Sequence, residues 1–203
     1  MMNTTSTPKS VPSRKKECTQ PKELSISKEP LLAQHEDGCT PLLQRILRSS
    51  SKVARDCVQP LLETQTAAAQ QADPNGWLPL HVALRYASAG LDTLQLLIDA
   101  YPAAAQHKTL KGLLPMHIAA MHGGHSDHDA AECMRLLLRA YPAAAQEPTP
   151  SGCLPLHYVA WFMGGAAASA CMRLLLEAHP DAASTKNESG DLPLHLLAQN
   201  KAG

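Results

Sequence analysis

The chain of 203 residues is poor in aromatic side chains, which make up 3% of it, and its formal net charge is zero. Alanine and leucine supply most of its apolar content, and this argues against a β-sheet, which favours β-branched and aromatic residues. With no excess of either charge, the chain has no overall field to attract nucleic acid or an anionic membrane. It also lacks a run of 18 apolar residues, so we expect no membrane-spanning helix.

The first 30 residues lack the apolar segment of a secretory signal. The six cysteines therefore fit a reducing compartment, and we expect a cytoplasmic location. Three cysteines stand at equivalent places in the repeat described below, where we expect small buried side chains rather than disulfide partners. These three are Cys57, Cys133 and Cys171.

Residues 1–37 differ in composition from the rest of the chain. They are rich in Ser, Thr, Pro, Lys and Glu and contain few large apolar side chains. Such a segment cannot offset the entropy cost of ordering, so we expect a disordered tail. The basic cluster Arg14, Lys15 and Lys16 is either part of this solvated tail or a nuclear address, which would place the protein in the nucleus.

A six-residue motif recurs along the rest of the chain. It reads Gly-Trp-Leu-Pro-Leu-His from Gly76, and close variants begin at Gly112, Gly152 and Gly190. Between these motifs, a leucine-rich segment, a proline and an alanine run keep one register. A period of 36 to 40 residues indicates one supersecondary unit repeated in tandem. A further copy begins near Gly38, and its sequence is degenerate. Terminal repeats are often degenerate because they have only one neighbour to pack on.

Each unit is predicted to be a helical hairpin followed by an extended loop. In the unit that starts near residue 76, the first helix begins at Pro79, whose fixed φ suits a first helical turn, and ends by Ser88–Gly90. Asp92 is expected to cap a second helix that runs to Ala100. The buried face of this second helix is predicted to consist of Leu94, Leu97 and Ile98. A single hairpin cannot bury its leucines alone, so neighbouring units must stack.

The repeats resemble those of the ankyrin family. Gly38–Leu42 keeps the family's Gly-x-Thr-Pro-Leu, and later units keep its glycine, proline and histidine. The resemblance covers residues 38–203 and implies an all-α, ankyrin-type solenoid of stacked helical hairpins. Its units would start near residues 38, 76, 112 and 152, with a partial unit at 190. The sequence departs from the family in its longer period and in leucine in place of the capping threonine. These leucines are Leu78, Leu114, Leu154 and Leu192.

The motif prolines and histidines are expected to be structural. Packed helices lie roughly 8 to 10 Å apart, whereas zinc needs nitrogens at about 2.0 to 2.1 Å, so histidines along a stack cannot converge on one ion. We expect these histidines to bond backbone groups at the helix start and in the adjoining loop. The motif residues are Pro79, His81, Pro115, His117, Pro155, His157, Pro193 and His195.

One inter-helix segment could bind metal instead. It places His122, His125 and His128 within seven residues, but no other unit repeats this pattern. Loss of zinc affinity when all three histidines are replaced would establish such a site. Elsewhere the sequence offers no nucleophile elbow, phosphate-binding loop or zinc-protease motif. We therefore expect no enzymatic activity and no cofactor.

The resemblance also implies where a partner would bind. In the family, contacts come from the residue after the glycine and from the fourth and fifth residues after the histidine, on the concave face. Carried onto this chain, they are Trp77, Arg85, Tyr86, Leu113, Met121, His122, Cys153, Trp161, Phe162 and Asp191. Aromatic residues, methionine and arginine are enriched at interfaces. Alternatively, Trp161 and Phe162 only fill a gap beneath the following loop.

The sequence thus predicts a non-catalytic module that binds another protein through its concave face. A regulatory or targeting subunit of an enzyme complex is the first alternative, and a metal-binding protein using the segment from His122 to His128 is the second. We expect no nucleic-acid partner. A single stoichiometric enzyme among co-purified proteins would favour the regulatory role.

Overall fold

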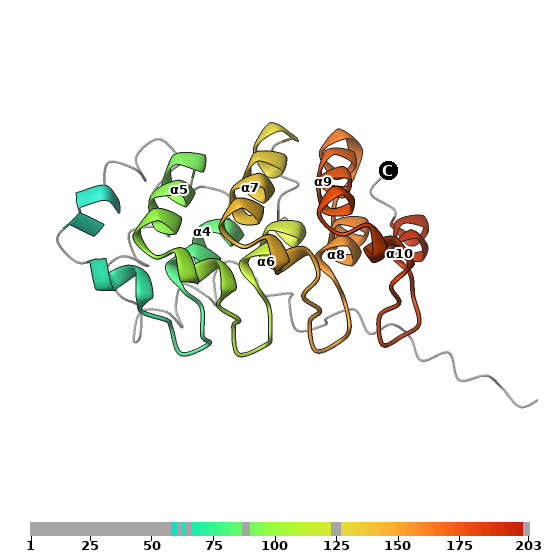
Figure 1. The fold of residues 1–203 in the computed structure, drawn as a ribbon, viewed down its shortest axis with the longest axis horizontal. Coiled ribbons are helices and arrows are strands. Elements are labelled where there is room, and N and C mark those ends of the chain that lie inside the picture. Colours follow the sequence, from blue (N-terminus) through green and yellow to red (C-terminus); the bar gives the residue numbers. More distant parts are fainter. Residues whose placement is uncertain (1–57, 61, 64–65, 87–89, 123–126, 201–203) are drawn as a thin grey trace, which may run out of the picture.

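The structure is a computed structural model that describes residues 58–60, 62–63, 66–86, 90–122 and 127–200 (Figure 1). The predicted tail, residues 1–37, and the start of the degenerate unit lie outside these residues. The described residues form helices and no strand, which confirms the all-α prediction for this part of the chain. No helix among them is long and apolar enough to cross a bilayer.

Two kinds of helix alternate along the chain. The first helix of each unit begins at the motif proline, as predicted. The first helices are α4 (Pro79–Tyr86), α6 (Pro115–His122), α8 (Pro155–Phe162) and α10 (Pro193–Gln199). The second helices are α5 (Leu91–Ala100), α7 (Asp127–Ala140) and α9 (Gly165–Ala178). Short 3-10 helices occupy the alanine runs: η1 (Thr66–Gln70), η2 (Pro102–Gln106), η4 (Pro142–Ala145) and η5 (Pro180–Ser184).

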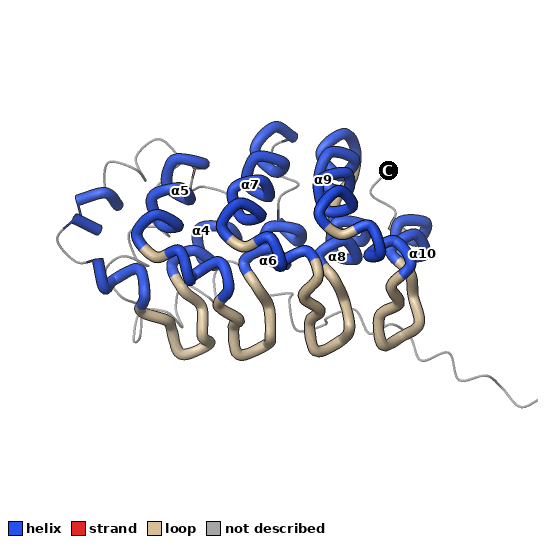
Figure 2. The backbone as a smooth tube through the Cα atoms, in the orientation of Figure 1, coloured by secondary structure: helices blue, strands red, loops and turns tan. Residues whose placement is uncertain are grey.

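The helices form two packed rows. In one row α4, α6, α8 and α10 contact one another in succession, and in the other α5, α7 and α9 do the same. Within each unit the first helix also packs on the second. The loops that precede the first helices project together along one edge of the molecule (Figure 2). The chain therefore extends along one direction, with neighbours in sequence also neighbours in space.

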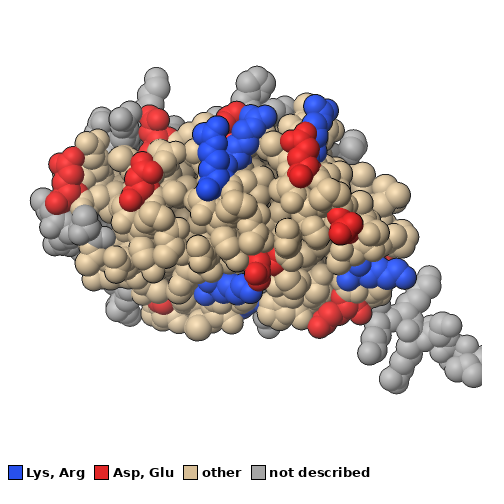
Figure 3. All heavy atoms as spheres, viewed as in Figure 1, with Lys and Arg blue, Asp and Glu red and all other residues tan. Residues whose placement is uncertain are grey.

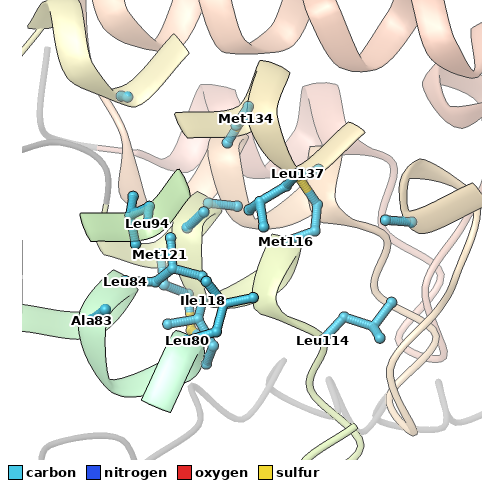
Figure 4. Close-up of a cluster of buried hydrophobic side chains, with 14 of the residues drawn as sticks. Leu80, Ala83, Leu84, Leu94, Leu114, Met116, Ile118, Met121, Met134 and Leu137 are labelled. Atoms are coloured by element: carbon cyan, nitrogen blue, oxygen red, sulfur yellow. The ribbon is translucent and has the colours of Figure 1, made fainter. Parts of the chain in front are cut away.

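The core lies between the two rows and continues from unit to unit. Figure 4 shows Leu84 from α4 and Leu94 from α5 facing Met121 and Ile118 from α6, with Met134 of α7 nearby. All five side chains are buried. Burying an aliphatic side chain of this size is worth about 1.5 to 3 kcal/mol. A single hairpin would expose these groups, so each unit depends on its neighbour for stability.

Two details of the predicted hairpin were wrong. Asp92 does not cap α5, because the helix begins at Leu91, with Gly90 at the cap position and no side-chain cap. The alanine runs form 3-10 turns rather than extended loops. In η2 the Tyr101 carbonyl accepts the Ala104 N–H at 3.0 Å, because Pro102 has the φ of a helical first turn. The 3-10 turns η2, η4 and η5 then pack against the second helices that precede them, α5, α7 and α9.

The equivalent cysteines are partly as predicted. Cys171 is fully buried in α9, and burial raises the pKa of its thiol to about 11. Cys133, at the matching place in α7, is half-buried and packs against the core. Cys57 lies outside the described residues. Cys171 therefore serves as a small apolar core side chain and is a poor nucleophile at neutral pH.

The motif glycines allow a matched test of unit stacking. Gly152 and Gly190 both have a positive φ, 71° and 84°. A Cβ on Gly152 would lie 3.0 Å from the Glu188 backbone nitrogen in the next loop, whereas a Cβ on Gly190 would meet nothing within 4 Å. Both alanine variants carry the strain of the left-handed conformation. We expect Gly152→Ala to lower Tm further than Gly190→Ala by several degrees in thermal melts, and equal losses would contradict the loop packing.

Candidate functional site

Each interior motif histidine joins the start of its own helix to the next loop. In α6, His117 Nδ1 accepts the Leu114 backbone N–H at 3.1 Å, and its Nε2 lies 3.1 Å from the Glu147 carbonyl. An acceptor at Nδ1 places the proton on Nε2, which donates to the carbonyl. The same pair of bonds forms at His81, with Leu78 and His107, and at His157, with Leu154 and Asp191. These are the backbone bonds expected from the sequence.

The electrostatics of these histidines follow from their burial. Desolvation lowers the pKa of His81 to about 3 and that of His117 to about 4. The pKa of His157 is lowered for the same reason. At neutral pH these imidazoles are uncharged and both ring nitrogens are engaged with the backbone. They therefore act as fixed hydrogen-bonding groups between units.

The loops contain buried polar residues that the sequence analysis missed. Asp73 Oδ1 accepts the backbone N–H groups of Asn75 and Trp77 at 2.8 and 2.7 Å. Asn187 Oδ1 accepts the Asp191 N–H at 2.8 Å in the same way. The buried set consists of Asp73, Thr109, Thr149 and Asn187. A small polar residue three places before every motif glycine was the available signal, because such side chains favour turns.

Contacts between loops hold them in a row. The Leu110 N–H donates to the Asn75 carbonyl at 3.1 Å. One unit further along the chain, Lys108 Nζ donates to the Glu147 carboxylate at 2.8 Å. This hydrogen bond lowers the pKa of the Glu147 carboxyl. The loops thus fix the position of the residue that follows each motif glycine.

At the N-terminal end of the first-helix row, the structure brings two predicted contact residues together. The Arg85 guanidinium lies over the Trp77 ring, 5.5 Å from its centroid. Trp77 also packs on His81, with ring centroids 6.1 Å apart. Both Trp77 and Arg85 are half-buried. Tyr86 ends α4, but its side chain lies outside the described ones.

A second aromatic group lies on α8. Phe162 is 40% exposed and stacks on Tyr158, with centroids 6.2 Å apart and an interplanar angle of 9°. Tyr158 in turn meets the edge of His117 in α6 at 5.4 Å. Trp161 is half-buried. Tyr158 was missed in the sequence analysis, although its place four residues before Phe162 puts the two side chains on one helix face.

Two predicted contact residues are wrong. Leu113 and Met121 are buried in the core, so neither side chain is available to a partner. Leu113 precedes a first helix, and Met121 packs beside Leu84 and Leu94 of the previous unit (Figure 4). Among the remaining predicted residues, His122, Cys153 and Asp191 are half-buried.

The possible metal segment is only partly described. His122 ends α6, whereas His125 and the side chain of His128 lie outside the described residues. In the described ranges no group of three or more histidine, cysteine or acidic side chains could hold a metal ion. The metal site on this segment stays a prediction from the sequence.

The two helix rows differ sharply in charge. The first helices together contain one charged residue, Arg85. The second helices contain Asp92, Asp99, Asp127, Asp129, Glu132, Arg135, Arg139, Arg173 and Glu177. Figure 3 shows acidic and basic side chains along the edge formed by the second helices. The second helices therefore carry the charged side chains that face solvent, whereas most side chains of α4 and α6 are uncharged because they are buried in the core.

The chain matches no protein-family model, and a search of curated proteins found no match. Its function is therefore inferred from the residues and contacts described above.

Proposed function

We propose that this protein is a non-catalytic, ankyrin-type interaction module that binds another protein through its first-helix face. This face consists of α4, α6, α8 and α10 with the loops that precede them. The observation that carries the proposal is the aromatic group on α8, where Phe162 is 40% exposed and stacks on Tyr158 beside the half-buried Trp161. Enrichment in aromatic residues is typical of interface cores.

The aromatic pair on α8 is suited to anchor a partner. Phe162 presents two-fifths of its surface to solvent, and its ring is held by stacking on Tyr158. A side chain that is already ordered loses little entropy on binding, and aromatic anchors often dominate binding energy. The Arg85 and Trp77 pair, on α4 and the loop before it, offers a second contact of the same kind. A partner could therefore span several units.

The rigidity of the face supports the same function. His81, His117 and His157 tie α4, α6 and α8 to the following loop, and loop-to-loop bonds hold the row. Pre-organised contact residues raise affinity by lowering the entropy lost on association. The histidines, which are the groups best able to perform chemistry, are occupied in this backbone bonding. Their use favours a binding role over a catalytic one.

We expect Phe162→Ala to weaken capture of the partner at least ten-fold. The change removes an exposed ring, so its effect on folding is small, and Tm should fall by only a few degrees. The measurement is quantitative mass spectrometry of proteins that co-purify with the full chain, compared between wild type and variant. A dominant enzyme among the captured proteins would indicate the regulatory-subunit alternative.

The matched control lies on the opposite row of helices. Arg173→Ala and Glu177→Ala remove exposed side chains from α9, and we expect both variants to capture the partner as well as wild type does. If the α9 variants lose the partner while Phe162→Ala retains it, the binding face is the second-helix row and the proposal is wrong.

A further inference from the structure

The last turn of α8 carries Trp161 and Phe162, which belong to the aromatic group that the proposed function assigns to partner binding. Phe162 is 40% exposed and Trp161 is half-buried. The residues on either side of this pair, Ala160 and Met163, are each 1% exposed. The two rings therefore stand between buried neighbours, and their placement depends on how the backbone of this turn is held.

A side chain from the next unit holds that backbone. The last carbonyls of a helix have no partner within the helix and need a donor from elsewhere. Asn200, which follows α10, donates from its amide Nδ2 to the Ala160 carbonyl at 3.2 Å and to the Met163 carbonyl at 2.9 Å. These two carbonyls come directly before and directly after the aromatic pair. One amide group thus bridges both ends of the turn that carries the two rings.

Asn200 is itself fixed by α10. Its backbone N–H donates to the Leu196 carbonyl at 2.9 Å and to the Leu197 carbonyl at 3.2 Å, which places it at the C-terminal cap of that helix. The Leu196 side chain is buried, and α10 packs on α8 (Figure 1). The amide therefore reaches the α8 turn from a fixed position on the neighbouring helix.

The repeat register sets Asn200 apart from its counterparts. It stands five residues after its motif histidine, where the earlier units have Tyr86, His122 and Phe162. At this position α8 presents an aromatic ring, whereas the following unit presents an amide that bonds back to α8. A phenylalanine in place of the amide would offer no donor to the two carbonyls, and partly buried backbone groups need one.

We propose that Asn200 is a positioning residue for the partner-binding site, because its amide holds the turn of Trp161 and Phe162 in the orientation that a partner meets. The affinity of α8 for the partner then depends on α10, without any contact between Asn200 and the partner. This consequence for affinity rests on the proposed function. The effect of Asn200 on the turn does not, and it can be measured without a partner.

The first test follows the environment of Trp161. In a Trp77→Phe background Trp161 is the sole tryptophan of the chain, so its fluorescence reports on this turn. Asn200→Asp keeps the size of the side chain but removes the N–H donor. We expect it to raise acrylamide quenching of Trp161 about two-fold and to shift the emission to longer wavelength, because the turn opens locally. Asn200→Ala, which introduces no charge, should act in the same direction.

Two control variants separate positioning from other effects. Gln199→Glu makes the same amide-to-carboxylate change at the neighbouring exposed residue. Ile98→Val lowers the overall stability from a buried position in α5. Neither control should alter the quenching of Trp161 at a temperature well below Tm. Unchanged quenching in the two Asn200 variants, or an equal rise in the controls, would overturn the proposal.

The second test combines Asn200→Asp with Phe162→Ala and measures partner capture by the full chain. Asn200→Asp alone should weaken capture about five-fold and should add nothing once the Phe162 ring is removed, because coupled residues act non-additively. Equal losses in both backgrounds would overturn the positioning role. Retention of the partner by Phe162→Ala would instead contradict the proposed function, and the quenching of Trp161 would still decide whether Asn200 holds the turn.

Discussion

His117→Ala is expected to lower the free energy of unfolding by about 3 to 5 kcal/mol, whereas His195→Ala is expected to lower it by less than about 1 kcal/mol. The first change leaves a cavity and leaves both hydrogen-bond partners of the imidazole unpaired, the buried Leu114 N–H and the Glu147 carbonyl. His195 is exposed and has one such bond, to the Leu192 N–H. The same substitution at equivalent positions thus separates the interior role from the terminal one.

Urea denaturation at pH 7, followed by circular dichroism, measures both values. The two variants have the same chemistry and the same place within a unit, so helix propensity cancels in the comparison. Similar losses of unfolding free energy in the two variants would mean that the bond from His117 to the next loop does not stabilise the protein. The proposed connection between units would then be wrong.

The protein is expected to lose stability steeply as pH falls from about 6.5 towards 4. The folded-state pKa values of about 3 for His81 and about 4 for His117 lie below the ordinary value of 6.5. In this range the unfolded chain binds protons that the folded chain does not, so acid favours unfolding. Each of the two histidines contributes about 1.4 kcal/mol per pH unit. At pH 7 and above this contribution disappears, because both states are then neutral.

The measurement is the free energy of unfolding from urea titrations at pH 7, 6 and 5. Acidic side chains also titrate towards the lower end of this range, so the informative comparison is with His117→Gln, which cannot take up the proton. We expect the slope of stability against pH to be shallower in this variant by about 1.4 kcal/mol per unit. Equal slopes in the two proteins would show that His117 titrates normally in the folded state.

The helical units could be predicted from the sequence because their signals are local. Each motif proline starts a helix, and the repeating register identified Leu94, Leu97 and Ile98 as the buried face of α5. The motif histidines were assigned to backbone bonding because their spacing along a stack prevents convergence on a metal. These predictions needed only the periodicity of one unit and the fact that units follow one another.

The contact residues were harder to predict because their exposure depends on the neighbouring unit. The resemblance to ankyrin repeats implies that Leu113 and Met121 contact a partner, yet both side chains are buried in this protein. Tyr158 was missed because its contact with His117 crosses from α8 to α6. Asp73 was missed for another reason: its bonds are local, but a small polar side chain before a glycine is common in loops of every kind.

The hydrogen-bonding state of the motif histidines tests the stacked arrangement most directly. Two-dimensional ¹H–¹⁵N spectra of the imidazoles distinguish the two neutral tautomers and the cation. For His81 and His117 we predict the neutral form with the proton on Nε2 throughout the range from pH 5 to 8, and for His157 the same tautomer with a pKa below the ordinary 6.5. Titration near 6.5 with averaged tautomers, as in a solvated imidazole, would show that these side chains do not join one unit to the next.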